Sequence, residues 1–172
     1  TYMAGGSLIL ALEQLKKAME ESGSKTYEDL TKAGKPTHYV GSKLAAGQEG
    51  PLDPVTGQGP SFESRVHNIQ MAEVEVNTDT GDVRVIKMTT AVDAGTVINP
   101  NNLEGQLQGG MDQGVGYALR EEYIHGKTKD WITFKFPTMK TSFPTDVIIR
   151  ETPRTKGPLG ATGIGEMTMV ST

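Results

Sequence analysis

Residues 99–119, NPNNLEGQLQGGMDQGVGYAL, combine a helix start signal with a regular apolar ridge, and this stretch decides the fold class. Asn99 is a strong N-cap residue, and Pro100 is well tolerated in a first helical turn. Apolar side chains then recur at every fourth position, as they do along the buried face of a helix. They are Leu103, Leu107, Met111, Val115 and Leu119. The stretch therefore predicts a packed helix.

Five glycines interrupt this predicted helix, and each interior glycine costs a helix about 0.5–1 kcal/mol relative to alanine. Gln106, Gly109, Gly110 and Gln113 share one face, so a strip of bare backbone between two carboxamides could lie against something flat. Packing against another helix through small residues explains the same spacing equally well. The sequence leaves both interpretations open.

Three stretches carry strand patterns. Residues 68–93 hold two runs of β-branched and apolar residues around a polar turn, which predicts a hairpin. Ile132, Phe134 and Phe136 alternate with polar residues and predict a further strand, and residues 147–149 predict a short one. The chain is therefore expected to have an α+β fold, a mixed sheet with helices packed on one side.

The rest of the chain predicts two more helices and a long irregular segment. An amphipathic pattern covers residues 3–21, and Thr26 has the character of an N-cap for a short helix. Residues 41–63 follow neither period and are expected to form an irregular excursion. Trp131 is expected in the core or in an interface. We expect one domain over residues 1–172, cut at both ends from a larger region.

Composition excludes several classes of function. The 172 residues include 17 Lys and Arg against 21 Asp and Glu, a net charge of -4 with scattered lysines, which argues against nucleic-acid binding. The absence of cysteine excludes disulfides, thiolate zinc sites and protein-bound iron–sulfur clusters within this chain. No apolar run approaches the roughly 20 residues of a membrane span, so no membrane partner and a cytoplasmic location are expected.

Residues 157–166, GPLGATGIGE, place a carboxylate directly after a glycine-dense loop. Such glycines let a backbone approach a ligand closely or adopt positive φ. A short helix-like run, residues 167–170, follows the acid. A loop that delivers Glu166 to the start of a regular element is typical of a functional site. A glycine-rich turn with a solvated glutamate explains the local pattern as well.

Two motifs, taken together, resemble those of a known protein family. Gly105–Gly116 and, about fifty residues later, Pro153–Glu166 resemble the carboxyl-terminal part of the molybdenum-binding subunit of the xanthine dehydrogenase and aldehyde oxidoreductase family. Residues 26–60 look most like the bacterial molybdenum aldehyde oxidoreductases. Each motif is weak alone, but their order and spacing are specific.

The resemblance implies roles for particular residues. Glu166 matches the catalytic base of the family's Gly-x-Gly-Glu loop, and Gln106 matches the glutamine that lies against the pterin. No direct protein ligand to the metal is expected. The residues expected to contact the cofactor are Gln106, Gly109, Gly110, Gly163 and Gly165.

The resemblance also implies cofactors and partners. We expect molybdopterin with molybdenum, in its cytosine dinucleotide form, and iron–sulfur clusters, with FAD as a further candidate, in other domains or subunits. The expected reaction oxidises an aldehyde to a carboxylic acid with water as the oxygen source. A purine or N-heterocycle hydroxylase of the same family and a non-catalytic binding module are the alternatives. The whole enzyme is expected to form a homo-oligomer, and the 172 residues alone to be inactive.

Overall fold

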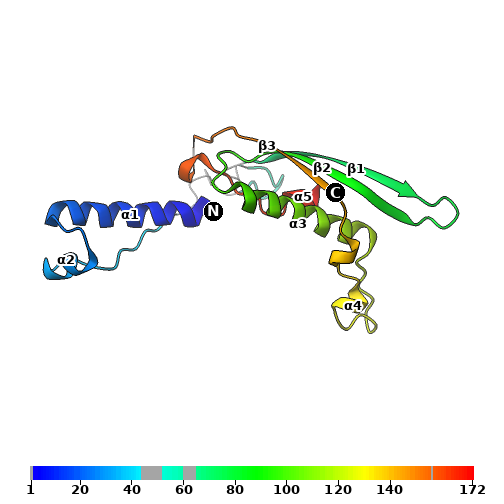
Figure 1. The fold of residues 1–172 in the computed structure, drawn as a ribbon, viewed down its shortest axis with the longest axis horizontal. Coiled ribbons are helices and arrows are strands. Elements are labelled where there is room, and N and C mark those ends of the chain that lie inside the picture. Colours follow the sequence, from blue (N-terminus) through cyan, green and yellow to red (C-terminus); the bar gives the residue numbers. More distant parts are fainter. Residues whose placement is uncertain (1, 44–51, 60–64, 156) are drawn as a thin grey trace. The chain divides into compact units, whose positions relative to one another are not determined.

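The computed structural model describes residues 2–43, 52–59, 65–155 and 157–172 (Figure 1). The chain divides into two compact units, Thr1–Arg65 with Pro153–Thr162 and Val66–Thr152 with Gly163–Thr172. The prediction of one domain over residues 1–172 is not tested by this division and stays a prediction.

Much of the predicted irregular excursion, residues 41–63, lies outside the described residues. Its described parts, residues 41–43 and 52–59, contain turns but no helix or strand.

The first unit contains the two predicted helices, α1 (Tyr2–Ser22) and α2 (Tyr27–Lys32). Thr26 caps α2 as expected: its Oγ1 accepts a hydrogen bond from the Asp29 backbone N–H at 3.2 Å, and the Asp29 carboxylate accepts one from the Thr26 N–H at 3.1 Å. This reciprocal pair satisfies two backbone donors that an uncapped helix would leave free. A 3-10 turn, η2 (Pro158–Gly160), packs on α1.

The second unit is built on a mixed sheet, as predicted, and this sheet has three strands. β1 (His67–Val76) and β2 (Val83–Asp93) form the antiparallel hairpin, and β3 (Thr145–Arg150) runs parallel to β2. The strand order is β1-β2-β3. Gly81 closes the hairpin turn with a φ of 79°, a backbone conformation that glycine adopts without steric cost.

A bulge in β2 brings Val85 onto the same face of the hairpin as Met88. Glu73 pairs with Lys87, but the next residue, Val74, pairs with Val85, so Ile86 is the extra residue. Because side chains alternate between faces, Val85, three positions before Met88, would point away from it if β2 were a regular strand without the bulge. Instead, Val85 packs in the same core cluster as Met88.

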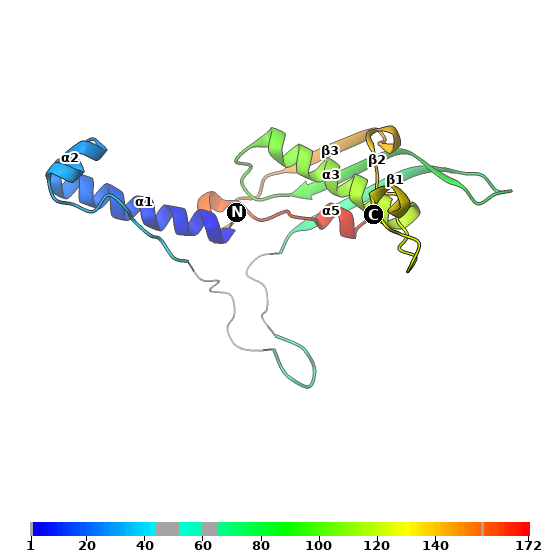
Figure 2. The same cartoon turned by 90° about the horizontal axis from the view of Figure 1, so that it is seen from below.

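Two helices cover this face of the sheet, α3 (Pro100–Leu119) and α5 (Met167–Val170) (Figure 2). One core cluster combines Met88 with two residues of α3, Met111 and Val115. A second combines Val92 and Ala94 with Leu107 of α3, with Ile164 and Met167 packed against it. The predicted arrangement of helices on one side of a mixed sheet is confirmed.

The opposite face of the sheet carries a row of apolar side chains across its three strands. Ala91 of β2 pairs with Ile69 on one side and Ile148 on the other. Ile69 is 77% exposed and Ile148 is 57% exposed. β3 pairs only with residues 88–93 of β2, so the hairpin continues beyond β3 as a two-stranded arm (Figure 1).

The strand predicted over residues 132–136 is wrong, because the structure has a short helix there, α4 (Trp131–Phe134). Asp130 caps α4, and its carboxylate accepts a hydrogen bond from the Thr133 N–H at 2.8 Å. Lys135 then ends the helix in the left-handed conformation, with a φ of 65°. The alternating aromatics reflect a local cluster, in which the Trp131 ring lies 5.6 Å from that of Phe136.

Trp131 itself is 73% exposed in this structure, so its predicted place in the core is wrong. An interface role for it stays a prediction. After α4, a 3-10 turn, η1 (Met139–Thr141), leads into β3.

Candidate functional site

The site is built on the first half of α3. The Asn99 side chain caps this helix as predicted, because its Oδ1 accepts a hydrogen bond from the Asn102 N–H at 3.0 Å. Gln106 follows on the helix, and its Nε2 donates a hydrogen bond to the carbonyl oxygen of Gly165 at 3.1 Å. The structure thus joins the two predicted motifs directly, at the residue that precedes Glu166.

The helix that follows Glu166 is fixed by two polar contacts. The fully buried Thr168 donates a hydrogen bond from Oγ1 to the carbonyl oxygen of Leu107 in α3 at 3.0 Å. Gln70 of β1 donates from Nε2 to the Thr168 carbonyl oxygen at 2.9 Å. Because α5 is tied to both α3 and the sheet, the backbone at Glu166 has a defined position.

Thr168 and Gln70 were not predicted as site residues from the sequence. The available signal was Thr168, a polar residue inside the apolar run of residues 167–170. Buried polar groups need partners, so such a residue predicts a hydrogen bond to a neighbouring element. Nothing in the local sequence identifies Leu107 or Gln70 as that partner.

Glu166 is exposed and directly precedes the first residue of α5. Its carbonyl oxygen accepts a hydrogen bond from the Met169 N–H at 3.0 Å. Its carboxylate makes no hydrogen bond or ion pair with any described residue. The carboxylate is therefore free to interact with a group from outside the described chain.

The glycines of α3 separate into two kinds. A Cβ on Gly110 would collide with the side chain of Thr168, and one on Gly114 would lie 2.9 Å from the Met169 carbonyl oxygen. These two glycines let α3 and α5 approach closely, as the helix-packing interpretation expected. A Cβ on Gly105 or Gly109 would meet no atom within 4 Å. Of the two glycines between Gln106 and Gln113, only Gly109 therefore leaves backbone open to a flat group.

The loop before Glu166 has a similar division. Gly157 and Gly160 adopt positive φ values of 99° and 74°. Gly163 and Gly165 do not adopt positive φ, and a Cβ on either would meet no atom within 4 Å. Their lack of a side chain leaves open backbone next to Glu166.

Asp112 adds an unusual carboxyl group on α3. Burial raises its pKa above the ordinary value of 3.8, and a hydrogen bond from Ser142 partly opposes that shift. The Ser142 Oγ lies 3.4 Å from each carboxylate oxygen.

Across the part of the chain that the structure describes, no group of three or more His, Asp or Glu side chains could hold a metal ion. Within the same residues, no helix is both long and apolar enough to cross a bilayer.

Comparisons with known proteins show the family of this chain. The family model of the molybdopterin cofactor-binding domain matches residues 1–143, which include Gln106 and the whole of α3. The chain belongs to this family. Glu166 lies beyond the residues that the family model matches.

Relatives of this molybdopterin cofactor-binding domain extend the likeness to the end of the chain. The aldehyde oxidoreductase of Megalodesulfovibrio gigas is 37% identical over 98% of the chain. A solved structure of that enzyme, under the name Desulfovibrio gigas, covers 99% of the chain with a TM-score of 0.89 and 36% identity. The nicotine 6-hydroxylase large subunit of Paenarthrobacter nicotinovorans is 35% identical over 57% of the chain.

The molybdopterin cofactor-binding domain described here spans only part of these relatives. It covers 19% of the aldehyde oxidoreductase and 13% of the nicotine 6-hydroxylase large subunit. The predicted family is confirmed, and the chain aligns with only a part of each of these relatives.

Proposed function

We propose that this chain supplies one wall and the general base of an active site that oxidises aldehydes to carboxylic acids. The single observation that carries the proposal is the hydrogen bond from Gln106 to the Gly165 carbonyl, beside a Glu166 carboxylate without a partner among the described residues. The likeness to aldehyde oxidoreductases over nearly the whole chain favours an aldehyde as substrate.

The residues around Glu166 fit a flat cofactor. Gly109 presents backbone without a side chain beside Gln106. The Gln106 Nε2 donates to the Gly165 carbonyl oxygen, and the Gln106 side-chain Oε1 remains an acceptor for a pterin N–H. Gly163 and Gly165 leave open backbone on the loop side. When bound, molybdopterin with molybdenum supplies the acceptor for two electrons, and we propose the cytosine dinucleotide form.

Gly110 enters this proposal indirectly. Its missing side chain brings Thr168 against α3, which places the Glu166 backbone next to Gln106. Its effect on the cofactor would therefore come through the spacing of α3 and α5.

The overall reaction converts an aldehyde and water into a carboxylic acid, two electrons and two protons. In this scheme Glu166 accepts the proton that the water-derived oxygen loses as it attacks the carbonyl carbon. The hydrogen bond from Gln106 to Gly165 limits movement of the backbone that carries the base. Positioning of this kind matters because a general base must lie within hydrogen-bond reach of the proton that it removes. Iron–sulfur clusters elsewhere in the enzyme, with FAD as a further candidate, would take up these electrons.

An N-heterocycle hydroxylase is the second candidate. The relatives include a nicotine 6-hydroxylase large subunit and a probable hypoxanthine oxidase of Escherichia coli, which is 28% identical over 86% of the chain. The same base and cofactor wall would serve that reaction. Assays of the purified enzyme with aromatic aldehydes and with N-heterocycles would separate the two candidates.

The role of Glu166 can be tested with Glu166→Gln in the purified enzyme. We expect kcat to fall by about 10²–10⁴-fold, the usual contribution of a general base, with the molybdenum content unchanged. Glu104→Gln is the matched control, because Glu104 is an exposed acid of α3 whose carboxylate accepts a hydrogen bond only from Gln108 among the described residues. Unchanged aldehyde oxidation in Glu166→Gln would instead favour a non-catalytic binding module.

A further inference from the structure

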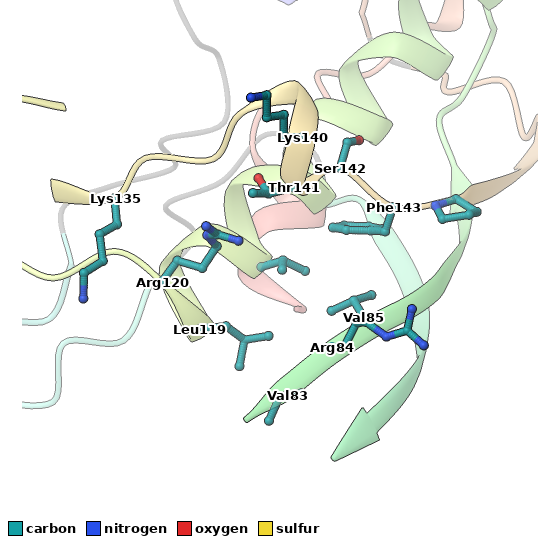
Figure 3. Close-up of a pocket in the computed structure, with 12 residues that line it drawn as sticks. Val83, Arg84, Val85, Leu119, Arg120, Lys135, Lys140, Thr141, Ser142 and Phe143 are labelled. Atoms are coloured by element: carbon teal, nitrogen blue, oxygen red, sulfur yellow. The ribbon is translucent and has the colours of Figure 1, made fainter. Parts of the chain in front are cut away.

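A second concave site lies at the other end of α3. It is a pocket of about 600 Å³ between the end of α3, the start of β2 and the segment from η1 into β3 (Figure 3). Val85 and Phe143 contribute to an apolar floor. Leu119 at this pocket follows Gln106 by 13 positions on α3, which corresponds to about 20 Å along the helix axis. The pocket is therefore distinct from the site at Glu166.

Among the described residues that line the pocket, four side chains are cationic and none is a carboxylate; the cations are Arg84, Arg120, Lys135 and Lys140 (Figure 3). This concentration contrasts with the net charge of -4 of the whole chain.

Two of the four cations have partners, and the other two have none among the described residues. Arg84 forms an ion pair with Glu75 at 2.7 Å, and Lys135 forms one with Glu122 at 3.8 Å. Arg120 and Lys140 have no ion pair or side-chain hydrogen bond with any described residue. The pocket therefore offers two uncompensated positive charges above an apolar surface.

The hydroxyl groups of the pocket are not directed toward an anion. Thr141 donates from Oγ1 to the Thr138 carbonyl oxygen at 2.9 Å. Ser142 donates from Oγ to the Asp112 carboxylate at 3.4 Å. A phosphate site normally gathers donors around one group of oxygens. Here the cations lie on separate elements, an arrangement that suits an extended ligand with several charges.

We propose that this pocket docks an acidic protein segment from another domain or subunit of the enzyme. The segment would place carboxylates beside Arg120 and Lys140 and an aliphatic or aromatic side chain on the floor at Val85 and Phe143. Arginine beside apolar surface is characteristic of protein interfaces. The chain covers only 19% of the related aldehyde oxidoreductase, so most of such an enzyme lies outside the aligned region.

Carbodiimide cross-linking of the purified enzyme tests this proposal, because the reagent joins a lysine amine to a carboxylate in direct contact. We expect mass spectrometry to find Lys140 joined to an Asp or Glu outside residues 1–172. Lys140→Arg is the matched control, since it keeps the charge but removes the reactive amine, and it should abolish only that cross-link. Arg120→Glu should reduce the cross-link several-fold, because like charges then face each other.

Acetylation of the same enzyme gives a second measurement. Lys140 should react several-fold more slowly in the native enzyme than in urea, whereas the exposed Lys127 of the loop before α4 serves as the reference for reagent activity. Reaction of Lys140 at equal rates in both states would overturn the proposal. Cross-links only to carboxylates within residues 1–172, or protection of Lys140 without any cross-link, would also overturn it.

A third measurement uses inorganic pyrophosphate. If pyrophosphate protects Lys140 from acetylation in the native enzyme and no protein cross-link forms, the pocket is a small-anion site and the proposal is wrong. None of these readouts depends on Glu166 or on oxidation of substrate, so failure here and failure of the proposed function are separate results.

Discussion

Gly110 and Gly105 lie on the same helix but have different surroundings. Gly110 faces the buried side chain of Thr168, whereas Gly105 faces open space. The same substitution should therefore have opposite effects at the two positions.

We expect Gly110→Ala to destabilise the protein by about 1–3 kcal/mol, because the added methyl group overpacks the contact between α3 and α5. Gly105→Ala should stabilise it by about 0.5–1 kcal/mol, since alanine favours a helix and the site has room. The free energy of unfolding in urea measures both. Equal effects of the two substitutions would contradict the contact with Thr168.

Asp112 should give unfolding a pH dependence opposite in sign to that of most carboxylates. Its pKa is raised in the folded state by burial, so the folded protein binds this proton more tightly than the unfolded chain does. The resulting stabilisation is present below the ordinary pKa of 3.8 and is lost as the pH rises from there through the folded pKa. Because asparagine does not ionise, Asp112→Asn removes this loss of stability at higher pH.

We therefore expect Asp112→Asn to become more stable relative to the unchanged protein as the pH rises above 3.8 and then to level off. Urea unfolding between about pH 3.5 and pH 7 measures the difference. Asp29 and Asp130 do not interfere, because hydrogen bonds lower their pKa values and their contributions are lost below 3.8. A difference that shrinks with rising pH would contradict the burial of Asp112.

The site residues that the sequence could predict were those in motifs. Gln106 and Glu166 belong to patterns with fixed spacing, and the structure brings their segments together. Thr168 and Gln70 could not be assigned roles, because their hydrogen bonds join elements far apart in the chain. Their role depends on the tertiary fold, which the local sequence does not specify.

At the level of elements, α4 depends on its cap. It has four residues, too few for a stable isolated helix. The Asp130 carboxylate accepts a hydrogen bond from the Thr133 N–H, and the Asp130 N–H donates one to the Thr133 Oγ1. We expect Asp130→Ala to unfold α4 and to speed hydrogen exchange at the Phe134 N–H, which bonds to the Asp130 carbonyl at 3.0 Å. Asp130→Asn keeps a side-chain acceptor and should retain most of the protection. Equal exchange rates in both variants would show that packing, and not the cap, holds α4.

The predictions of helices and strands were correct where the sequence signal came from neighbouring residues. Caps at Thr26 and Asn99 and the turn at Gly81 each satisfy nearby backbone groups, so the sequence could specify them. The strand predicted from the alternating aromatics of residues 132–136 was wrong, because a period of two over five residues also fits a short helix and a turn. The parallel pairing of β3 with β2 rests on contacts between distant segments and had no local signal.

At the scale of the whole molecule, we expect the proposed cofactor wall to need residues from outside this chain. The carboxylate of Glu166 is exposed, and the chain covers 19% of the related aldehyde oxidoreductase. We expect the isolated 172 residues, produced in a host that makes molybdopterin, to contain far less than one molybdenum atom per chain. Elemental analysis by mass spectrometry after gel filtration measures this. One molybdenum atom per chain would contradict the idea that other domains complete the site.

The two-stranded arm beyond β3 has a consequence for the motions of the protein. Residues 88–93 of β2 have hydrogen-bonded neighbours on both sides, whereas the part of the hairpin from Val74 to Val85 is a ribbon of two strands. Two strands alone are marginally stable in water. The arm can therefore open and close as a local unit while the three-stranded part stays folded. The bulge at Ile86 lies next to the boundary between the two parts and is the natural hinge for that motion.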